Sequence, residues 1–418
     1  MKKLLTICLL VCVLLLCLAS CSSRQASPAS TTTLVAPTST PPTTQAPLHE
    51  HVDGDGDSVC DSCSLHLSQG LRYALSQDGT YYIVIGIGTC TDTELAIPST
   101  YEGLPVQAIA PRAFSGEMGQ AQGSFTKVVV PDSMKTIGSR AFAGCSSLIS
   151  VQMGNGVDTV ASEAFVSCRQ LKSVQVSCRL QTIERAAFSD CATLEDLDLP
   201  DSLLEIQAGA FRGCTALTRV ELGAAVHTVG LCPFMGSGIT SITVDSRNIN
   251  FSSIDGNLYT KDGTTLLFYA PGKTETSFAL PRGTVAIGPY AFEAIEHLQT
   301  VSLPDTLLAI GEYAFFGCPS LAEITIPDSV VTLEEGAFFS CFSMERVTVG
   351  LGVTTVKPRA FEGCMALESV TFQNPNGWQC IPYGASSGTQ LLAKTLSQTS
   401  TAAEYLTQTY VNYTWVRN

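Results

Sequence analysis

The segment LAEITIPDSVVTLEEGAFFSCF, residues 321–342, is one copy of the repeated unit that decides the fold. Apolar and polar residues alternate from Ile324 to Ile326, a period of two that is typical of a half-buried strand. Pro327 then ends the strand, because proline has no N–H to contribute to a ladder. Leu333, in a second short segment, is also expected to point inward. One unit of this length cannot bury its apolar side chains by itself, so we expect the units to stack.

The unit recurs with a period of 23 residues. Its most visible marker is the dipeptide Ala-Phe, and seven copies carry a cysteine three residues after the phenylalanine. A fixed period in the low twenties predicts a solenoid, in which each turn contacts only its neighbours. We interpret the cysteines as small buried apolar groups, with a metal or disulfide ladder as the alternative. The dipeptides are Ala141-Phe142, Ala164-Phe165, Ala187-Phe188, Ala210-Phe211, Ala291-Phe292, Ala314-Phe315, Ala337-Phe338 and Ala360-Phe361, and the cysteines are Cys145, Cys168, Cys191, Cys214, Cys318, Cys341 and Cys364.

The regular spacing is interrupted after Pro233-Phe234, which occupy the Ala-Phe positions of their turn. The next Ala-Phe begins 58 residues later, at Ala291. This step equals two periods plus an insertion of about 12 residues. Apolar runs within residues 254–259 and 266–269 flank Asp262-Gly263, a dipeptide that favours tight turns. We therefore expect a β-hairpin insertion near residues 248–273.

These copies resemble the BspA-like class of bacterial leucine-rich repeats. The shared pattern is L-x-x-V-x-I-P-x-x-V-x-x-I-x-x-x-A-F-x-x-C, and its clearest copies are residues 194–214 and 321–341. The resemblance covers roughly residues 95–372 and implies a β-rich solenoid of about 11 turns. The implied fold class is a leucine-rich repeat solenoid with short helical or 3-10 segments, a parallel sheet on one face and a cap at each end. A bacterial surface protein is also implied, because characterised relatives are mostly adhesins that bind host proteins or other cells.

The flanks of the repeats complete the predicted domain organisation. YALSQDGTYYIVIGIGTCTD within residues 71–105 resembles the amino-terminal lead-in of this class, and NPNGW at residues 374–378 resembles its carboxy-terminal closure. The predicted segments are a lipoprotein signal peptide at 1–20, a Ser/Thr/Pro-rich tether at 21–48, an acidic His/Asp/Cys motif at 49–66, a lead-in cap at 70–112, leucine-rich repeats at 113–372 and a C-terminal cap at 373–418.

The first residues have the features of a secretory leader. Lys2-Lys3 precede an apolar run over residues 4–18, and small residues follow before Cys21. The ending Leu-Ala-Ser-Cys resembles a bacterial lipobox, in which the cysteine becomes the lipidated first residue of the mature chain. The alternative is an ordinary cleaved signal. Because one diacylated cysteine supplies two acyl chains, we expect a stable anchor on the extracellular face of the bacterial membrane.

A dense polar cluster lies between the tether and the repeats. Carboxylates at alternate positions with glycines between them suit a hard cation such as calcium. The loop is incomplete as an EF-hand, because Ser64 stands where a glutamate is required. Zinc, with C-x-x-C as half of a site, and a metal-free Cys60–Cys63 disulfide are the two alternatives. The calcium candidates are Asp53, Asp55, Asp57 and Asp61, and the zinc candidates are His49, His51, Cys60 and Cys63.

The outward positions of the predicted strands indicate where a partner could bind. They are mostly serine and threonine, with one acidic patch and no aromatic stripe, which argues against a lectin. Arginine and aromatic side chains are the usual anchors of protein interfaces. The hairpin aromatics are candidates on that ground, with packing against the solenoid as the alternative. The partner-binding candidates are Asp196, Asp198, Arg219, Glu221, Arg346, Tyr259, Phe268 and Tyr269.

The sequence carries no pattern that predicts catalysis. It contains no G-x-S-x-G, no H-E-x-x-H and no P-loop. A net charge of −14 also makes nucleic acid an unfavourable partner. Two hypotheses follow: a lipid-anchored surface protein that binds a host matrix or bacterial surface protein, or a structural spacer of the envelope without a specific ligand.

Overall fold

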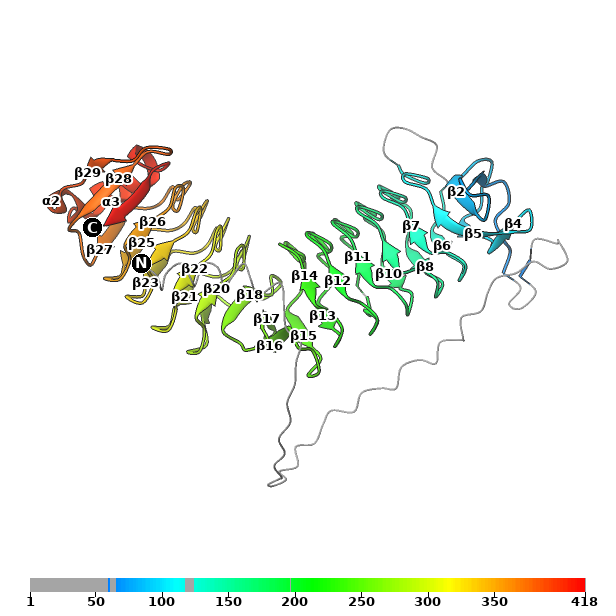
Figure 1. The fold of residues 1–418 in the computed structure, drawn as a ribbon, viewed down its shortest axis with the longest axis horizontal. Helices are drawn as coiled ribbons and strands as arrows, with labels where there is room; N and C mark the ends of the chain where they lie inside the picture. Colours follow the sequence, from blue (N-terminus) through cyan, green and yellow to red (C-terminus); the bar gives the residue numbers. More distant parts are fainter. Residues whose placement is uncertain (1–58, 61–64, 117–123, 196, 418) are drawn as a thin grey trace, which may run out of the picture. The chain divides into compact units, whose positions relative to one another are not determined.

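The protein is described from a computed structural model, in which residues 59–60, 65–116, 124–195 and 197–417 are defined. These residues belong to one compact unit, and its successive turns stack on one another (Figure 1). They form a β-solenoid of about 12 turns with parallel sheets. The predicted fold class is therefore confirmed.

The first strand of each turn builds one parallel ladder. Paired residues lie one period apart, as Glu323 and Arg346 do. Along the strand over residues 323–326, exposed and buried side chains alternate, as the period of two predicts. The ladder is divided into three sheets, which contain β3 (Glu94–Ala96), β6 (Lys127–Val129), β8 (Ser150–Gln152) and β10 (Ser173–Gln175); β13 (Arg219–Leu222) and β15 (Ser241–Val244); and β19 (Ser277–Ala279), β21 (Thr300–Ser302), β23 (Glu323–Ile326), β25 (Arg346–Val349) and β27 (Ser369–Phe372).

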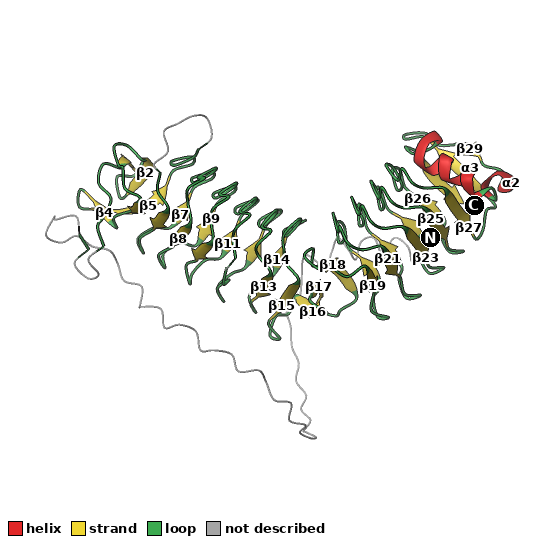
Figure 2. Cartoon of the chain, turned by 180° about the vertical axis from the view of Figure 1, so that it is seen from behind, coloured by secondary structure: helices red, strands yellow, loops and turns green. Residues whose placement is uncertain are grey.

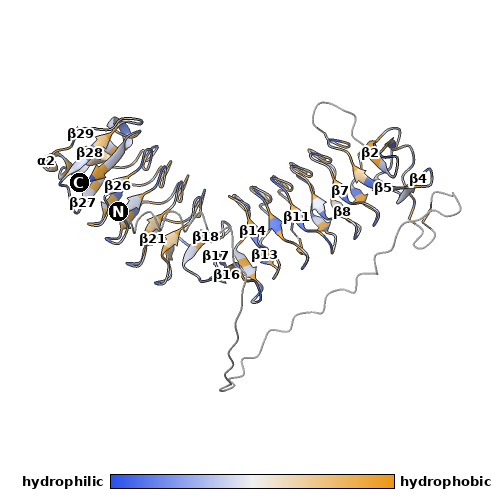
Figure 3. Cartoon of the chain, viewed as in Figure 1, coloured by the Kyte–Doolittle hydropathy of each residue, from blue (hydrophilic) through white to orange (hydrophobic). Residues whose placement is uncertain are grey.

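A second parallel ladder, beyond the one expected, is built by the short segment that follows the proline. Most of its strands have two residues, an outer polar one and an inner apolar one, such as Thr182 and Ile183. Figure 3 shows hydrophobic and hydrophilic residues alternating along the turns. Its strands are β5 (Leu104–Ile109), β7 (Thr136–Ile137), β9 (Thr159–Val160), β11 (Thr182–Ile183), β12 (Glu205–Ile206) and β14 (Thr228–Val229), and then β18 (Thr265–Phe268), β20 (Ala286–Ile287), β22 (Ala309–Ile310), β24 (Thr332–Leu333) and β26 (Thr355–Val356).

Two columns of side chains run through the core. The repeated phenylalanines are fully buried and stack ring on ring, with centroids 5.3 Å apart between Phe165 and Phe188 and 5.6 Å apart between Phe188 and Phe211. The repeated cysteines are also buried. Each directs its Sγ to the carbonyl oxygen of the phenylalanine in the preceding turn, as Cys191 does to Phe165 at 3.2 Å. This arrangement supports the packing interpretation of the cysteine column, because every sulfur has a backbone acceptor and none lies in a disulfide.

The predicted hairpin insertion is present and has a third strand. β16 (Phe251–Ile254) and β17 (Asn257–Thr260) are antiparallel around Asp255 and Gly256, whose φ angles of 51° and 71° are those of a tight hairpin turn. β17 then pairs with β18, which joins the second ladder. Phe268 packs into the core of the preceding turns, whereas Leu266 packs into the core of the following turns. The insertion therefore connects two apolar cores within one stack.

Both ends of the stack are covered. β1 (Arg72–Leu75) and β2 (Tyr82–Gly86) form an antiparallel hairpin that extends the second ladder, with β4 (Thr100–Tyr101) paired to β5. The described helices lie in the C-terminal cap (Figure 2). No helix among the described residues is long and apolar enough to cross a membrane. The C-terminal cap contains β28 (Trp378–Ile381), β29 (Thr389–Gln390), α2 (Ala393–Leu396), α3 (Thr399–Glu404), the π-helix η2 (Tyr405–Thr409) and β30 (Thr414–Arg417).

Candidate functional site

Several predicted site residues lie outside the described part of the chain. They are the lipidation candidate Cys21, the metal candidates His49, His51, Asp53, Asp55, Asp57, Asp61 and Cys63, and the acidic Asp196. Of the metal candidates only Cys60 is described, and it is buried, with its N–H donating to the carbonyl oxygen of Leu65. Within the described ranges, no cluster of His, Cys, Asp and Glu has the geometry of a metal site.

The predicted polar candidates on the first ladder are exposed. Arg219 and Glu221 project from the same face of β13, and Asp198 is exposed in the preceding turn. Arg346 already has two ion-pair partners, because its guanidinium contacts Glu323 at 3.0 Å and Glu345 at 2.9 Å. Its charge is thus largely neutralised by its own chain.

The hairpin aromatics are not available to a partner. Tyr259, Phe268 and Tyr269 are 0%, 3% and 1% exposed. Phe268 meets Phe234 edge-on at 5.7 Å, and Tyr269 stacks on Phe292 at 5.2 Å. The prediction that they bind a partner is therefore wrong, and the packing alternative is correct, because Phe268 and Tyr269 continue the core column across the insertion and Tyr259 is buried in the core.

A different set of aromatic side chains lies half-exposed in the C-terminal half of the stack. We name Tyr290, Tyr313, Phe316, Phe339 and Arg359 the aromatic edge. Tyr290 stacks on Tyr313 at 5.3 Å, and Phe316 stacks on Phe339 at 5.5 Å. The two stacks touch, since the Tyr313 ring is 6.1 Å from both phenylalanine rings. Together they form a continuous surface over consecutive turns.

The backbone at the bend before each Ala-Phe dipeptide positions this edge. Tyr290 and Tyr313 have left-handed φ angles of 57° and 52°, and the N–H of Tyr290 donates to the carbonyl oxygen of Glu312 in the next turn. Gly336 occupies the same position one turn after Tyr313. A Cβ atom there would lie only 2.3 Å from the ring of Tyr313. Glycine therefore leaves the space that the ring of Tyr313 occupies.

Arg359 closes one end of the edge. Its guanidinium carbon lies 4.7 Å from the ring centroid of Phe339, a cation–π geometry. Its Nη1 donates to the hydroxyl of Tyr313 at 3.2 Å, and its Nε donates to Glu362 at 2.6 Å. The hydrogen bond to Glu362 raises the pKa of Arg359 further above its usual value. The guanidinium of Arg359 thus contacts the ring of Phe339, the hydroxyl of Tyr313 and the carboxylate of Glu362.

Acidic side chains surround the tyrosines of the edge. The charges of Glu293 and Glu312 act on Tyr290, where burial is the main cause of a raised pKa. Glu335 accepts a hydrogen bond from the hydroxyl of Tyr313 at 3.2 Å. Glu293 is only 7% exposed, and its Oε2 has no hydrogen-bond partner within the described ranges. Burial accordingly raises the pKa of Glu293.

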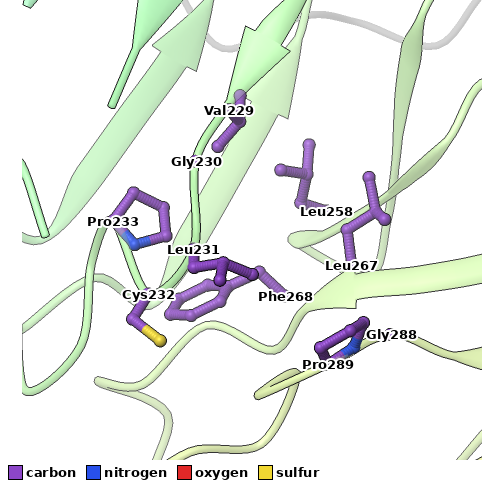
Figure 4. A pocket seen from close by; sticks show the side chains of 10 residues that line it. All are labelled: Val229, Gly230, Leu231, Cys232, Pro233, Leu258, Leu267, Phe268, Gly288 and Pro289. Atoms are coloured by element: carbon purple, nitrogen blue, oxygen red, sulfur yellow. The ribbon is translucent and has the colours of Figure 1, made fainter. Parts of the chain in front are cut away.

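An apolar pocket, whose lining is drawn in Figure 4, includes Pro289, the residue that precedes Tyr290 of the edge. Cys232 and Pro289 are among its lining residues, and Cys232 lies near enough to Tyr290 to contribute to the raised pKa of that tyrosine. Leu231, also in the lining, is 55% exposed. The remaining lining residues are Val229, Gly230, Pro233, Leu258, Leu267, Phe268 and Gly288.

Sequence reasoning missed the aromatic edge because it considered only the outward strand positions and the hairpin. A signal was nevertheless present. Tyr290 and Tyr313 are one period apart, and so are Phe316 and Phe339. Large aromatic residues repeated at a second position of the unit, next to the core Ala-Phe, indicate a second column of rings.

The stacked turns, two parallel ladders and open lateral surfaces define a solenoid of the leucine-rich repeat class. The family model for the BspA type leucine rich repeat region matches residues 107–240 and 267–384 in 6 copies. The chain therefore belongs to the BspA-type leucine-rich repeat family.

Solved structures show the same architecture. A leucine rich cell surface protein from Faecalibacterium prausnitzii is 25% identical, with a TM-score of 0.51 and alignment over 79% of this chain and 96% of that one. The pneumococcal vaccine antigen PcpA is 22% identical, with a TM-score of 0.58 over 74% and 82% of the two chains. A leucine-rich repeat protein from Eubacterium ventriosum is 21% identical, with a TM-score of 0.52 over 73% and 83%. No curated protein is matched significantly.

Proposed function

We propose that this chain is a bacterial cell-surface protein, anchored by lipid at Cys21, that binds a protein partner through the aromatic edge. The observation that carries the binding role is the half-exposed ring surface with Arg359 at its end. Aromatic and arginine side chains are enriched at the energetic centres of protein interfaces. A surface location is supported by the similarity to the Faecalibacterium cell surface protein.

The binding role is tested by capture of partners on the immobilised full chain. We expect surface extracts of host cells or neighbouring bacteria to yield a protein that binds the wild type and fails to bind Phe316→Ala/Phe339→Ala. Phe342→Ala is the matched control, because Phe342 is 47% exposed and lies outside the edge. The captured protein is then purified and titrated directly. We expect the double variant to bind at least about tenfold more weakly than the wild type, because Phe316 and Phe339 are proposed to be central anchors of the interface.

Two outcomes would contradict this role. The first is an identical set of captured proteins for wild type and double variant, both shown to be folded by thermal melting. The second is an equal loss of affinity with the Phe342→Ala control. Either result would favour the alternative role as an envelope spacer.

The anchor is tested by metabolic labelling with a fatty acid in a bacterial host. We expect the wild type to carry the label and to fractionate with membranes, because two acyl chains give stable attachment. Cys21→Ala should lose both properties. Label that persists in this variant would show that the lipid is attached at another residue.

A further inference from the structure

The aromatic edge already binds one guanidinium, that of its own Arg359. The contacts are a ring face on Phe339, a hydroxyl on Tyr313 and a carboxylate on Glu362. These three kinds of group are the ones that recognise arginine, whose planar cation stacks on rings and donates several hydrogen bonds at once. The contacts of Arg359 therefore show that the aromatic edge can bind a guanidinium group.

The opposite end of the edge has the same kinds of group, but among the described residues no arginine or lysine lies over the Tyr290 ring or forms an ion pair with Glu293. The column that contains Phe316 and Phe339 begins with Glu293 and ends with Glu362, each one period away. Three residues before Glu362 stands Arg359, whereas three residues before Glu293 stands Tyr290. Glu362 is consequently paired, and Glu293 keeps an oxygen without a hydrogen-bond partner in the described part of the chain.

The surroundings of Tyr290 also favour a cation with an apolar stem. Among the described residues the ring contacts of Tyr290 are those with Tyr313 and Phe316. Its chain neighbour Pro289 and the nearby Cys232 both line the apolar pocket. Glu312 is exposed beside it. Burial raises the pKa of Glu293, and the neighbouring Cys232 side chain and the exposed Arg212 oppose that rise; Arg212 forms no ion pair with Glu293 within the described ranges. The end of the edge is thus acidic and lined by apolar groups.

We propose that this end of the aromatic edge takes an arginine side chain of the protein partner, with the guanidinium on Tyr290, its charge met by Glu293 and Glu312, and its methylene stem against the apolar pocket. The inference rests on the proposed function and deepens it by naming the contact chemistry of the partner. Long cationic side chains commonly place an apolar stem on apolar surface and the charge beside it. Lysine fits less well, because its ammonium does not stack as a plane.

The test uses the full chain and synthetic repeat peptides of Gly-Ser-Arg, Gly-Ser-Lys and Gly-Ser-citrulline, with binding followed by calorimetry. Citrulline keeps the planar shape of arginine and lacks its charge. We expect the arginine peptide to bind at least about tenfold more tightly than the citrulline peptide, and more tightly than the lysine peptide. Addition of salt should weaken the binding, since exposed charges contribute to it.

Two variants locate the contact. Tyr290→Leu and Glu293→Gln should each weaken binding of the arginine peptide by about fivefold or more. Tyr383→Leu and Glu368→Gln are matched controls, because they make the same changes at exposed positions outside the edge. Equal binding of arginine and citrulline peptides, or effects no larger than those of the controls, would overturn the inference. If a captured protein still requires Phe316 and Phe339 in that case, the proposed function stands and only the arginine contact is wrong.

Discussion

Phe188→Ala is expected to lower the free energy of unfolding by about 3–5 kcal/mol, the usual cost of removing a buried ring from a core. Phe188 is 0% exposed and is stacked between Phe165 and Phe211. Its removal leaves a cavity and separates two ring contacts. Because each turn of a solenoid is stabilised by its neighbours, the damage should spread to the adjacent turns first.

Chemical denaturation and hydrogen exchange measure this effect. Denaturation gives the loss of stability, and exchange should show reduced protection in residues 160–215 before the rest of the stack. Phe342→Ala is the control, since it removes the same ring from an exposed position and should cost less than about 1 kcal/mol. Equal losses of unfolding free energy in the two variants would contradict the conclusion that Phe188 belongs to a buried column of rings.

Trp415→Ala should have an effect of similar size, about 3–5 kcal/mol, at the end of the stack. Trp415 is 1% exposed, its ring stacks on Phe372 at 6.0 Å, and its Nε1 donates to the carbonyl oxygen of Tyr410 at 3.2 Å. It lies in β30, which pairs with both β26 and β28. Loss of the ring should release β30 and leave β26 as an open edge strand, which favours association.

Thermal melting combined with light scattering tests the role of the cap. We expect Trp415→Ala to melt earlier and to form oligomers on warming. Tyr383→Ala, which removes a ring that is 97% exposed in the same cap, should change neither property. A monomeric Trp415→Ala protein with wild-type melting would show that β30 does not protect the end of the stack.

The sequence by itself determined the repeat. In a solenoid, each core residue packs against the residue one period away in the adjacent turn. A column of the core therefore appears in the sequence as one residue type repeated at a fixed spacing. The phenylalanine column, the cysteine column and the first ladder could all be predicted in this way. The hairpin of β17 and β18 was also predictable, because Asp262-Gly263 is a local turn signal that needs no tertiary contact.

Only the tertiary structure decided which aromatic side chains are exposed. Tyr269 lies one period before Phe292, in the phenylalanine position of its turn, so the spacing by itself places it in the core column. Tyr259 lies in an inserted strand that has no second copy, so only packing across the interruption shows that it is buried. The aromatic edge joins two columns that lie three positions apart in the unit. Their adjacency depends on the left-handed bend at Tyr290 and Tyr313, a backbone conformation that these residue types do not indicate. The bend turns the rings outward, and stacking of the turns then brings them together.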